Sequence, residues 1–218
     1  MWKLLLKSVI GVLVVPVMFA VTHAYYANLV MVPELAGSLR FFLWGVAGYV
    51  ILHLLFYKPT YLYVLGHEAI HAGVAWAFGG KVKSFNVSKE GGSVGTDKSN
   101  FVIELSPYFV PIYAIIVTLI YFIVASSYSI DGSVFVFLIG FTLAFHIIST
   151  IEVMKIRQPD IVKSGYFFSI VIVYVLNIVV IAMIFALLFR SFSAKQFFVD
   201  TYLMTKGAYI AIVRQLFF

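Results

Sequence analysis

The chain has 218 residues, of which 63% are hydrophobic and only 11% are charged, with a formal net charge of +6. Globular proteins are about half apolar and about a quarter charged, so this composition excludes an ordinary soluble domain and indicates an integral membrane protein. The basic residues stand singly at the ends of apolar runs, as membrane-boundary residues do, so the charge does not indicate a nucleic-acid partner.

Apolar runs, free of charged residues apart from Glu68 in the third, predict about six transmembrane helices joined by short connections. The runs cover residues 8–33, 41–57, 59–80, 105–130, 132–151 and 164–189. Lys3 and Lys7 before the first run resemble the start of a signal peptide, but the run is longer than a signal's apolar region, so we expect an uncleaved helix. The predicted fold is an all-α polytopic membrane protein.

The third run contains His67-Glu68-Ala69-Ile70-His71, the HExxH pattern of zinc sites. Residues four apart lie on one face of a helix, so both imidazoles can bind one metal ion and Glu68 can reach a metal-bound water. Each ionisable group at the centre of a bilayer costs roughly 2.5–3.5 kcal/mol, so this cluster favours a functional site over a chance match on a polar helix face. The chain has no cysteine, so histidine and carboxylate must hold any zinc.

The segment 81–100 follows Gly79 and Gly80, which we expect to end the motif helix. It has β-branched residues on either side of Gly91 and Gly92, a pattern that predicts a short hairpin with a glycine turn. A strand at membrane depth requires surrounding protein or a water-filled cavity, so we expect a re-entrant segment that lines an aqueous pocket beside the motif helix. An ordinary polar loop is the alternative.

Two further patterns describe the later helices. Pro107 and Pro111 lie one turn apart, and an interior proline removes a backbone hydrogen bond, so we expect a bent, locally open helix there. In the tail 191–218, charged residues recur among aromatic ones. That spacing favours a helix lying along the membrane interface over another span.

Several acidic residues and one histidine are candidates for a third metal ligand. Glu104 is more typical of an interfacial carboxylate. His146 and Glu152 lie six residues apart and do not share a helix face, so we do not expect them to bind one ion together. Asp160 follows Pro159 at the start of the last run, where the helix dipole favours an ionised carboxylate and hence metal binding. The spacing is equally consistent with a simple acid at a helix start.

The chain resembles the site-2 protease family of intramembrane zinc metalloproteases (M50-type) in four features. These are the HExxH motif in an apolar helix, the glycines after it, the hairpin-like segment, and a later Asp that opens a helix. The closer likeness is to its small branch without a PDZ domain, over residues 61–170. The resemblance implies Zn²⁺ held by His67, His71 and a downstream Asp, with Glu68 as the general base.

The chain departs from the family at the third ligand. The family's usual motif there is Asp-Gly after a leucine in a span, whereas the Asp131-Gly132 pair of this chain lies in a predicted loop after an isoleucine. Asp160 resembles the shorter Asp motif of the small branch. The resemblance therefore favours Asp160 over the other three candidates, which are Glu152, His146 and Asp131.

The family also implies a function, a domain plan and a substrate. We expect a zinc metalloendopeptidase that hydrolyses peptide bonds of transmembrane proteins in the lipid bilayer, with zinc-bound water activated by Glu68. The single membrane domain 1–218 would comprise two peripheral spans in 1–57, a metalloprotease core in 58–190 and the interfacial tail. An unwound substrate could add as a strand to the hairpin near Phe85, Val87 and Val94.

Orientation follows from the basic residues. Six alternating spans place eight Lys and Arg on the face of the hairpin and Asp160, and three on the other face, or seven if the tail is counted. The positive-inside rule then predicts an active site nearer the cytoplasmic face, and we expect a bacterial or archaeal cell membrane.

Two rival hypotheses remain from the sequence. The first is a metal-ion transporter or channel that uses the intramembrane histidine and acidic groups, with support from His23, His53 and His146. The second is an inactive relative that binds membrane partners, which the intact HExxH motif does not favour.

Overall fold

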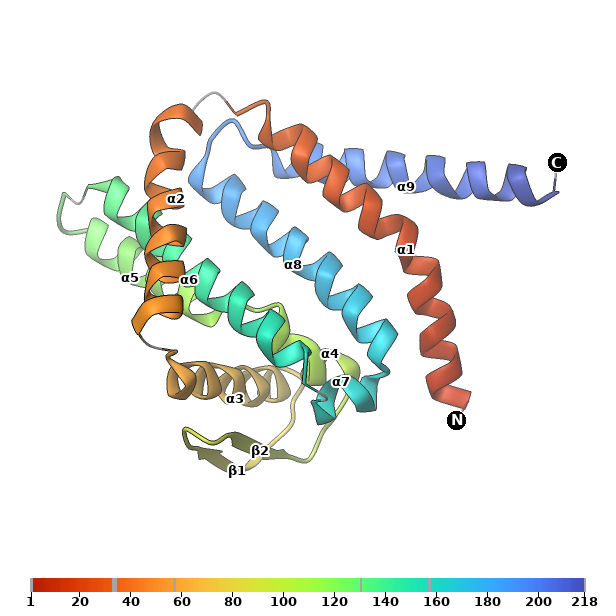
Figure 1. Cartoon of the computed structure of the whole chain (residues 1–218), viewed down its shortest axis with the longest axis horizontal. Coiled ribbons are helices and arrows are strands. Elements are labelled where there is room, and N and C mark those ends of the chain that lie inside the picture. Colours follow the sequence, from red (N-terminus) through yellow and green to blue (C-terminus); the bar gives the residue numbers. More distant parts are fainter. Residues whose placement is uncertain (1, 33–34, 57, 130, 157, 218) are drawn as a thin grey trace. The chain divides into compact units, whose positions relative to one another are not determined.

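The computed structural model describes residues 2–32, 35–56, 58–129, 131–156 and 158–217 (Figure 1). Helices form most of the regular structure in these ranges, and the one sheet among them has two strands. In chain order the elements are α1 (Trp2–Leu29), α2 (Leu35–Ile51), η1 (Leu52–Phe56), α3 (Thr60–Ala77), β1 (Val82–Val87), β2 (Gly92–Thr96), α4 (Phe101–Leu105), η2 (Ser106–Tyr108), α5 (Ile112–Ala125), α6 (Gly132–Met154), α7 (Pro159–Ser164), α8 (Tyr166–Leu188) and α9 (Ala194–Phe217).

Four helical segments are long and apolar enough to cross a membrane, which confirms the predicted all-α polytopic membrane fold. They are Leu4–Leu29, Gly37–Phe56, Gly132–Met154 and Tyr166–Leu188. A fifth candidate combines the segments Phe101–Tyr108 and Ile112–Ala125, which meet at an angle of 72°. Pro107 and Pro111 flank this break, and the bend they predicted is confirmed, because neither proline has the N–H that a continuous helix would use.

The described residues thus contain four or five candidate spans, whereas the sequence predicted about six. The run 59–80 accounts for one span, since α3 is less apolar than the candidate spans. Its His67, Glu68 and His71 lower its mean hydropathy. The bent pair Phe101–Tyr108 and Ile112–Ala125 accounts for a second if it is not counted as one span. The tail forms α9, which is not among the candidate spans either, and its interfacial position stays a prediction. The predicted span ends at residues 33, 57 and 130 lie outside the described residues.

Contacts divide the chain into two compact units. One comprises Met1–Glu34 and Val162–Phe218, and the other comprises Leu35–Ile161. In the first, α1 packs against α8 and α9, with the Thr22 and Tyr174 hydroxyls 2.8 Å apart. The predicted division into peripheral spans, a core 58–190 and a tail stays a prediction.

Within the unit Leu35–Ile161, α2 and α6 pack closely through glycines. A Cβ at Gly45 would overlap the carbonyl oxygen of Phe137, and a Cβ at Gly140 would overlap that of Phe42. Small residues let helix backbones approach each other in a membrane, where packing rather than the hydrophobic effect drives helix association. Both helices contribute to a buried cluster of Tyr49, Ala144 and Phe145.

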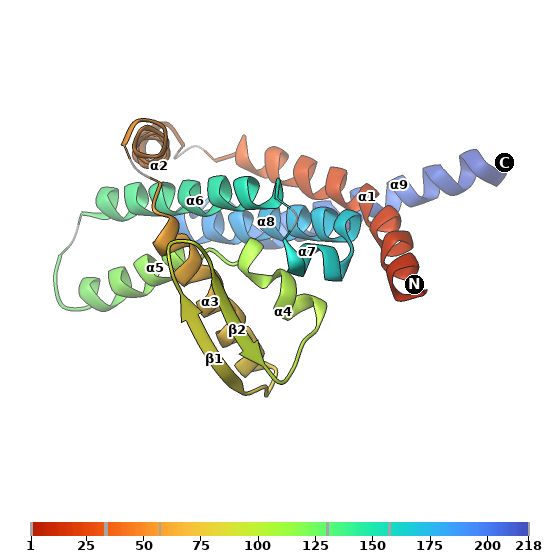
Figure 2. The same ribbon diagram turned by 60° about the horizontal axis from the view of Figure 1, so that its bottom comes forward.

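The predicted hairpin is present and lies alongside α3 (Figure 2). β1 and β2 pair antiparallel, with Phe85 opposite Val94 and Val87 opposite Gly92. Gly91 in the turn has a φ of +154°, a conformation that favours glycine. Most residues of β1 are exposed, so the hairpin is held mainly by its own ladder and by its contact with α3.

Candidate metal centre

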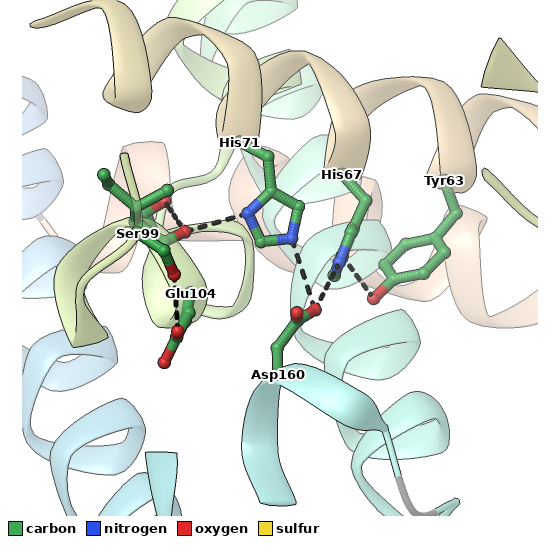
Figure 3. A network of polar contacts seen from close by, with 8 residues as sticks. Tyr63, His67, His71, Ser99, Glu104 and Asp160 are labelled. Carbon is green, nitrogen blue, oxygen red and sulfur yellow. Dashed lines mark hydrogen bonds and ion pairs between the residues drawn. The ribbon is translucent and has the colours of Figure 1, made fainter. Parts of the chain in front are cut away.

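α3 places the two histidines of the HExxH motif side by side. The ring centroids of His67 and His71 are 4.8 Å apart, and their side chains are only 10% and 12% exposed. Asp160 approaches them from the first turn of α7, directly after Pro159. Its Oδ2 lies 3.3 Å from His71 Nε2 and 3.7 Å from His67 Nε2 (Figure 3). The fold therefore brings the favoured third ligand to the motif.

Each histidine makes a second contact through its other ring nitrogen. His71 Nδ1 lies 2.8 Å from the backbone carbonyl oxygen of Ile103, which can only accept, so this nitrogen carries the hydrogen. His67 Nδ1 lies 3.2 Å from the Tyr63 hydroxyl. In a neutral His71 ring, the lone pair of Nε2 then faces the Asp160 carboxylate. Two electron-rich atoms stay this close only with a proton or a metal ion between them.

The donor set fits a zinc ion. Zinc binds histidine nitrogen at about 2.0–2.1 Å and carboxylate oxygen at about 2.0–2.2 Å, so neighbouring ligand atoms of a tetrahedral site lie about 3.3–3.5 Å apart. One ligand atom each from His67, His71 and Asp160 lie within 4.8 Å of one another. Across the described ranges, no other group of histidine and acidic side chains gathers this closely. Three ligands leave one position open, as in catalytic zinc sites.

The charge state of Asp160 suits metal binding. Burial alone would raise the pKa of its carboxyl, but the hydrogen bonds and charges of His67 and His71 outweigh burial and hold the pKa well below its usual range. The carboxylate is therefore ionised at neutral pH, and the ionised form is the one that binds a metal.

Glu68 lies against the hairpin. It is only 6% exposed, and no hydrogen bond or ion pair joins its carboxylate to the rest of the described chain. Gly92 covers it closely: a Cβ at this position would lie 2.6 Å from Glu68 Cγ and 2.9 Å from Oε1. Burying a carboxylate without a partner is costly, so this arrangement points to chemistry rather than to a contribution to folding.

Glu152, one alternative to Asp160, belongs to a separate polar cluster. Its Oε1 accepts a hydrogen bond from Lys58 Nζ at 2.7 Å and lies 3.2 Å from His53 Nε2. The other nitrogen of His53 lies 3.1 Å from the Tyr49 hydroxyl. His53 is therefore a buried, hydrogen-bonded histidine.

The remaining candidates for the third ligand also lie outside the group formed by His67, His71 and Asp160. Asp131 caps α6, where it accepts from the backbone N–H of Ser133 at 2.9 Å. Glu104 accepts from the Ser99 hydroxyl at 2.7 Å. His146 lines a cavity of about 20 Å³ together with His67 but does not join the close ligand group.

The three predicted substrate contacts share one face of the hairpin. Phe85 and Val87 are two residues apart on β1, and Val94 lies directly opposite Phe85 on β2. Gly92 belongs to the same face, because it lies opposite Val87. Its added Cβ would meet Glu68, so this face turns towards α3. Phe85 is 44% exposed, which leaves it accessible to a bound chain.

Sequence reasoning missed three neighbours of the motif. Tyr63 lies four residues before His67, and this spacing was the signal that could have placed it beside the ring. Tyr108 is fully buried, and its ring meets that of His67 edge to face at 5.1 Å. Gly92 was predicted in the hairpin turn, but nothing in the sequence indicated that it would lie against Glu68.

No known protein family, curated protein or solved structure matches this chain.

Proposed function

We propose that this chain is an intramembrane zinc metalloprotease of the site-2 protease type, which hydrolyses peptide bonds of transmembrane substrate proteins. The observation that carries the proposal is the approach of Asp160 to His67 and His71, with the buried Glu68 inside the same motif. Two histidines, one carboxylate and an adjacent acid form the donor set of hydrolytic zinc sites. The apolar helices make a membrane-embedded substrate the natural one.

The proposed reaction is hydrolysis of one peptide bond by one water molecule. A Zn²⁺ ion held by His67, His71 and Asp160 would supply a Lewis acid that lowers the pKa of water towards about 7 and polarises the peptide carbonyl. Glu68 takes a proton from the attacking water, whose oxygen forms the new bond to the carbonyl carbon. The C–N bond breaks, and Glu68 passes that proton to the amine nitrogen.

The substrate must be unwound before it is cut. A transmembrane helix hides its peptide bonds in its own hydrogen bonds, so the segment to be cleaved has to become extended. A two-stranded sheet leaves an unpaired edge on each strand, and an extended segment can pair with such an edge by strand addition. Proline substitutions along β1 and β2 test this step, because prolines that left cleavage intact would exclude strand pairing.

Glu68→Gln is the decisive variant for the reaction type. Glutamine keeps the size of the side chain but cannot accept the proton, so we expect the variant to retain zinc and to lose cleavage of a transmembrane substrate in proteoliposomes. A transporter would instead keep metal flux in this variant. Flux that survives Glu68→Gln, together with no peptide cleavage by the wild type, would contradict the proposal.

Metal content of purified protein tests the third ligand. We expect Asp160→Ala to lose most of its zinc and His146→Ala to keep it, because Asp160 lies within reach of both motif histidines and His146 is not in the close ligand group found among the described residues. Loss of zinc from His146→Ala alone would overturn the site assignment.

The orientation in the membrane is part of the proposal. The hairpin and its connections carry Lys81, Lys83, Lys89 and Lys98, an excess that favours an active site nearer the cytoplasmic face. Because the chain has no cysteine, a single Ser88→Cys substitution gives a unique label on the hairpin turn. Its reaction with a membrane-impermeant thiol reagent only after the inner face is exposed would support this orientation in a bacterial or archaeal membrane.

A further inference from the structure

Tyr63 is an outer partner of the candidate metal centre that the sequence motif does not contain. We propose that its hydroxyl is a positioning group, which fixes the ring and the tautomer of His67 so that Nε2 is free to bind the metal. The inference rests on the proposed metal site and adds a residue to it.

The geometry of Tyr63 follows from α3. Tyr63 lies one helical turn before His67, so the two side chains are neighbours on the helix surface. The hydroxyl oxygen is 3.2 Å from His67 Nδ1. The two rings are 5.6 Å apart between centroids and inclined at 50°, so the phenol also packs against the imidazole. Both contacts restrict rotation of the His67 ring.

The direction of this hydrogen bond decides whether His67 can be a ligand. If Nδ1–H donates to the Tyr63 oxygen, Nε2 presents a lone pair towards Asp160. If the Tyr63 O–H donated to Nδ1, the imidazole hydrogen would lie on Nε2 and would block the metal. A tyrosine oxygen that accepts from Nδ1 is therefore part of a working site.

The phenolic O–H of Tyr63 can donate its hydrogen away from His67, into a neighbouring cavity. Tyr63 lines a cavity of about 90 Å³ whose walls also include Thr60, Ser149 and Glu152. The cavity has room for water, and its polar side chains give such a water hydrogen-bond partners, so water there can accept the phenolic hydrogen. The hydroxyl can then accept from His67 on one side and donate on the other.

The two motif histidines differ in the kind of hydrogen-bond partner that orients each ring. The partner of His71 is the backbone carbonyl of Ile103, which no side-chain substitution removes and which can only accept. The partner of His67 is a side-chain hydroxyl that one substitution deletes. Removal of an outer partner of a metal-bound histidine typically weakens metal affinity by about 10–100-fold. We assign that sensitivity to Tyr63.

The test is zinc affinity measured by competition with a chelating dye, without substrate. Tyr63→Phe keeps the ring and removes the hydroxyl, and we expect its dissociation constant for Zn²⁺ to rise by about tenfold or more. The visible spectrum of the Co²⁺-loaded variant should also change, because the spectrum reports ligand geometry. Tyr113→Phe is the matched control: its hydroxyl donates to the backbone carbonyl of Leu62 and contacts no ligand, so its affinity should stay within about threefold of wild type.

Two results would overturn the inference. One is a Zn²⁺ dissociation constant for Tyr63→Phe within about threefold of wild type, and the other is an equal loss in Tyr113→Phe. If circular dichroism shows that Tyr63→Phe is misfolded, Tyr63→Met, which also lacks the hydroxyl, gives a second measurement. The protease proposal fails separately: wild-type protein that binds zinc more tightly than Tyr63→Phe but cleaves no peptide would contradict the proposed function and leave this role of Tyr63 intact.

Discussion

Replacing Gly92 with alanine tests how closely the hairpin covers Glu68. The added Cβ would lie 2.6 Å from Glu68 Cγ and 2.7 Å from Val64 Cγ1. Carbon atoms in ordinary contact lie about 3.5–4.0 Å apart, so Glu68 or the strand must move by about 1 Å. Misplacing a reacting group by about 1 Å can cost about 10²-fold in rate, and overpacking typically costs about 1–3 kcal/mol of stability.

Cleavage of a transmembrane substrate in proteoliposomes is the assay. We expect kcat of Gly92→Ala to fall by about 10²-fold with zinc content unchanged, because the added Cβ meets Glu68, the proposed general base, and none of the proposed metal ligands. Gly73→Ala on α3 is the matched control, since no atom lies within 4 Å of its added Cβ and alanine is the better helix former. Activity of Gly92→Ala within about threefold of wild type would refute the reasoning.

Three further predictions follow from contacts outside the ligand set. A Val64→Cys, Gly92→Cys pair should form a disulfide, because the Cβ atoms lie at most about 4.2 Å apart. The added Cβ at position 92 should itself lower the activity, as in Gly92→Ala, so the reduced and oxidised forms of the same double variant are compared: oxidation should stop the remaining cleavage and a reductant should restore it to the reduced level. Equal cleavage by the two forms would show that substrate enters without movement of the hairpin. Gly45→Ala should lower the stability in detergent by about 1–3 kcal/mol, because the added Cβ overlaps α6. Gly37→Ala is the control and should not lower it, since its Cβ meets nothing within 4 Å. Equal melting temperatures for the two variants would contradict the tight α2–α6 packing. The pKa of Asp131 is lowered because its carboxylate accepts hydrogen bonds from Ser133, so its stabilisation is present above the unfolded pKa of about 3.9 and is lost as pH falls through the folded value. The melting-temperature difference between wild type and Asp131→Ala should therefore be constant from about pH 5 to 7 and shrink below about pH 4, and a difference that grows in acid would reverse the sign of this argument.

Local patterns in the sequence predicted the features that depend on few residues. The i, i+4 spacing of His67 and His71 placed both rings on one helix face, and Pro107 and Pro111 predicted the break between α4 and α5. The glycines after Glu90 predicted the hairpin turn. Each of these follows from backbone geometry alone, so no knowledge of the remaining fold was needed.

Features that depend on distant residues could not be predicted in the same way. Spacing left two roles for Asp160 equally plausible, a metal ligand and a simple acid at a helix start. The sequence could not decide between them, because 89 residues separate Asp160 from His71 and the packing of α7 is what brings them together. The partners of Glu152 were hidden for the same reason, since Lys58 and His53 lie on other elements. The number of candidate spans differs from the prediction at α3, where the residues of the candidate site also make the helix less apolar.

The backbone carbonyl that holds His71 bears on how the protein could acquire its metal. Ile103 and Tyr63 supply contacts that orient the two imidazoles from within the chain. Zinc fingers behave differently, because their fold forms only when zinc binds and collapses when it is withdrawn. If the proposed zinc site is correct, a centre oriented in this way would be open to loading, emptying and reloading in the finished membrane protein. Its working fraction would then track the supply of free metal in the compartment it faces, independently of the synthesis of new chains.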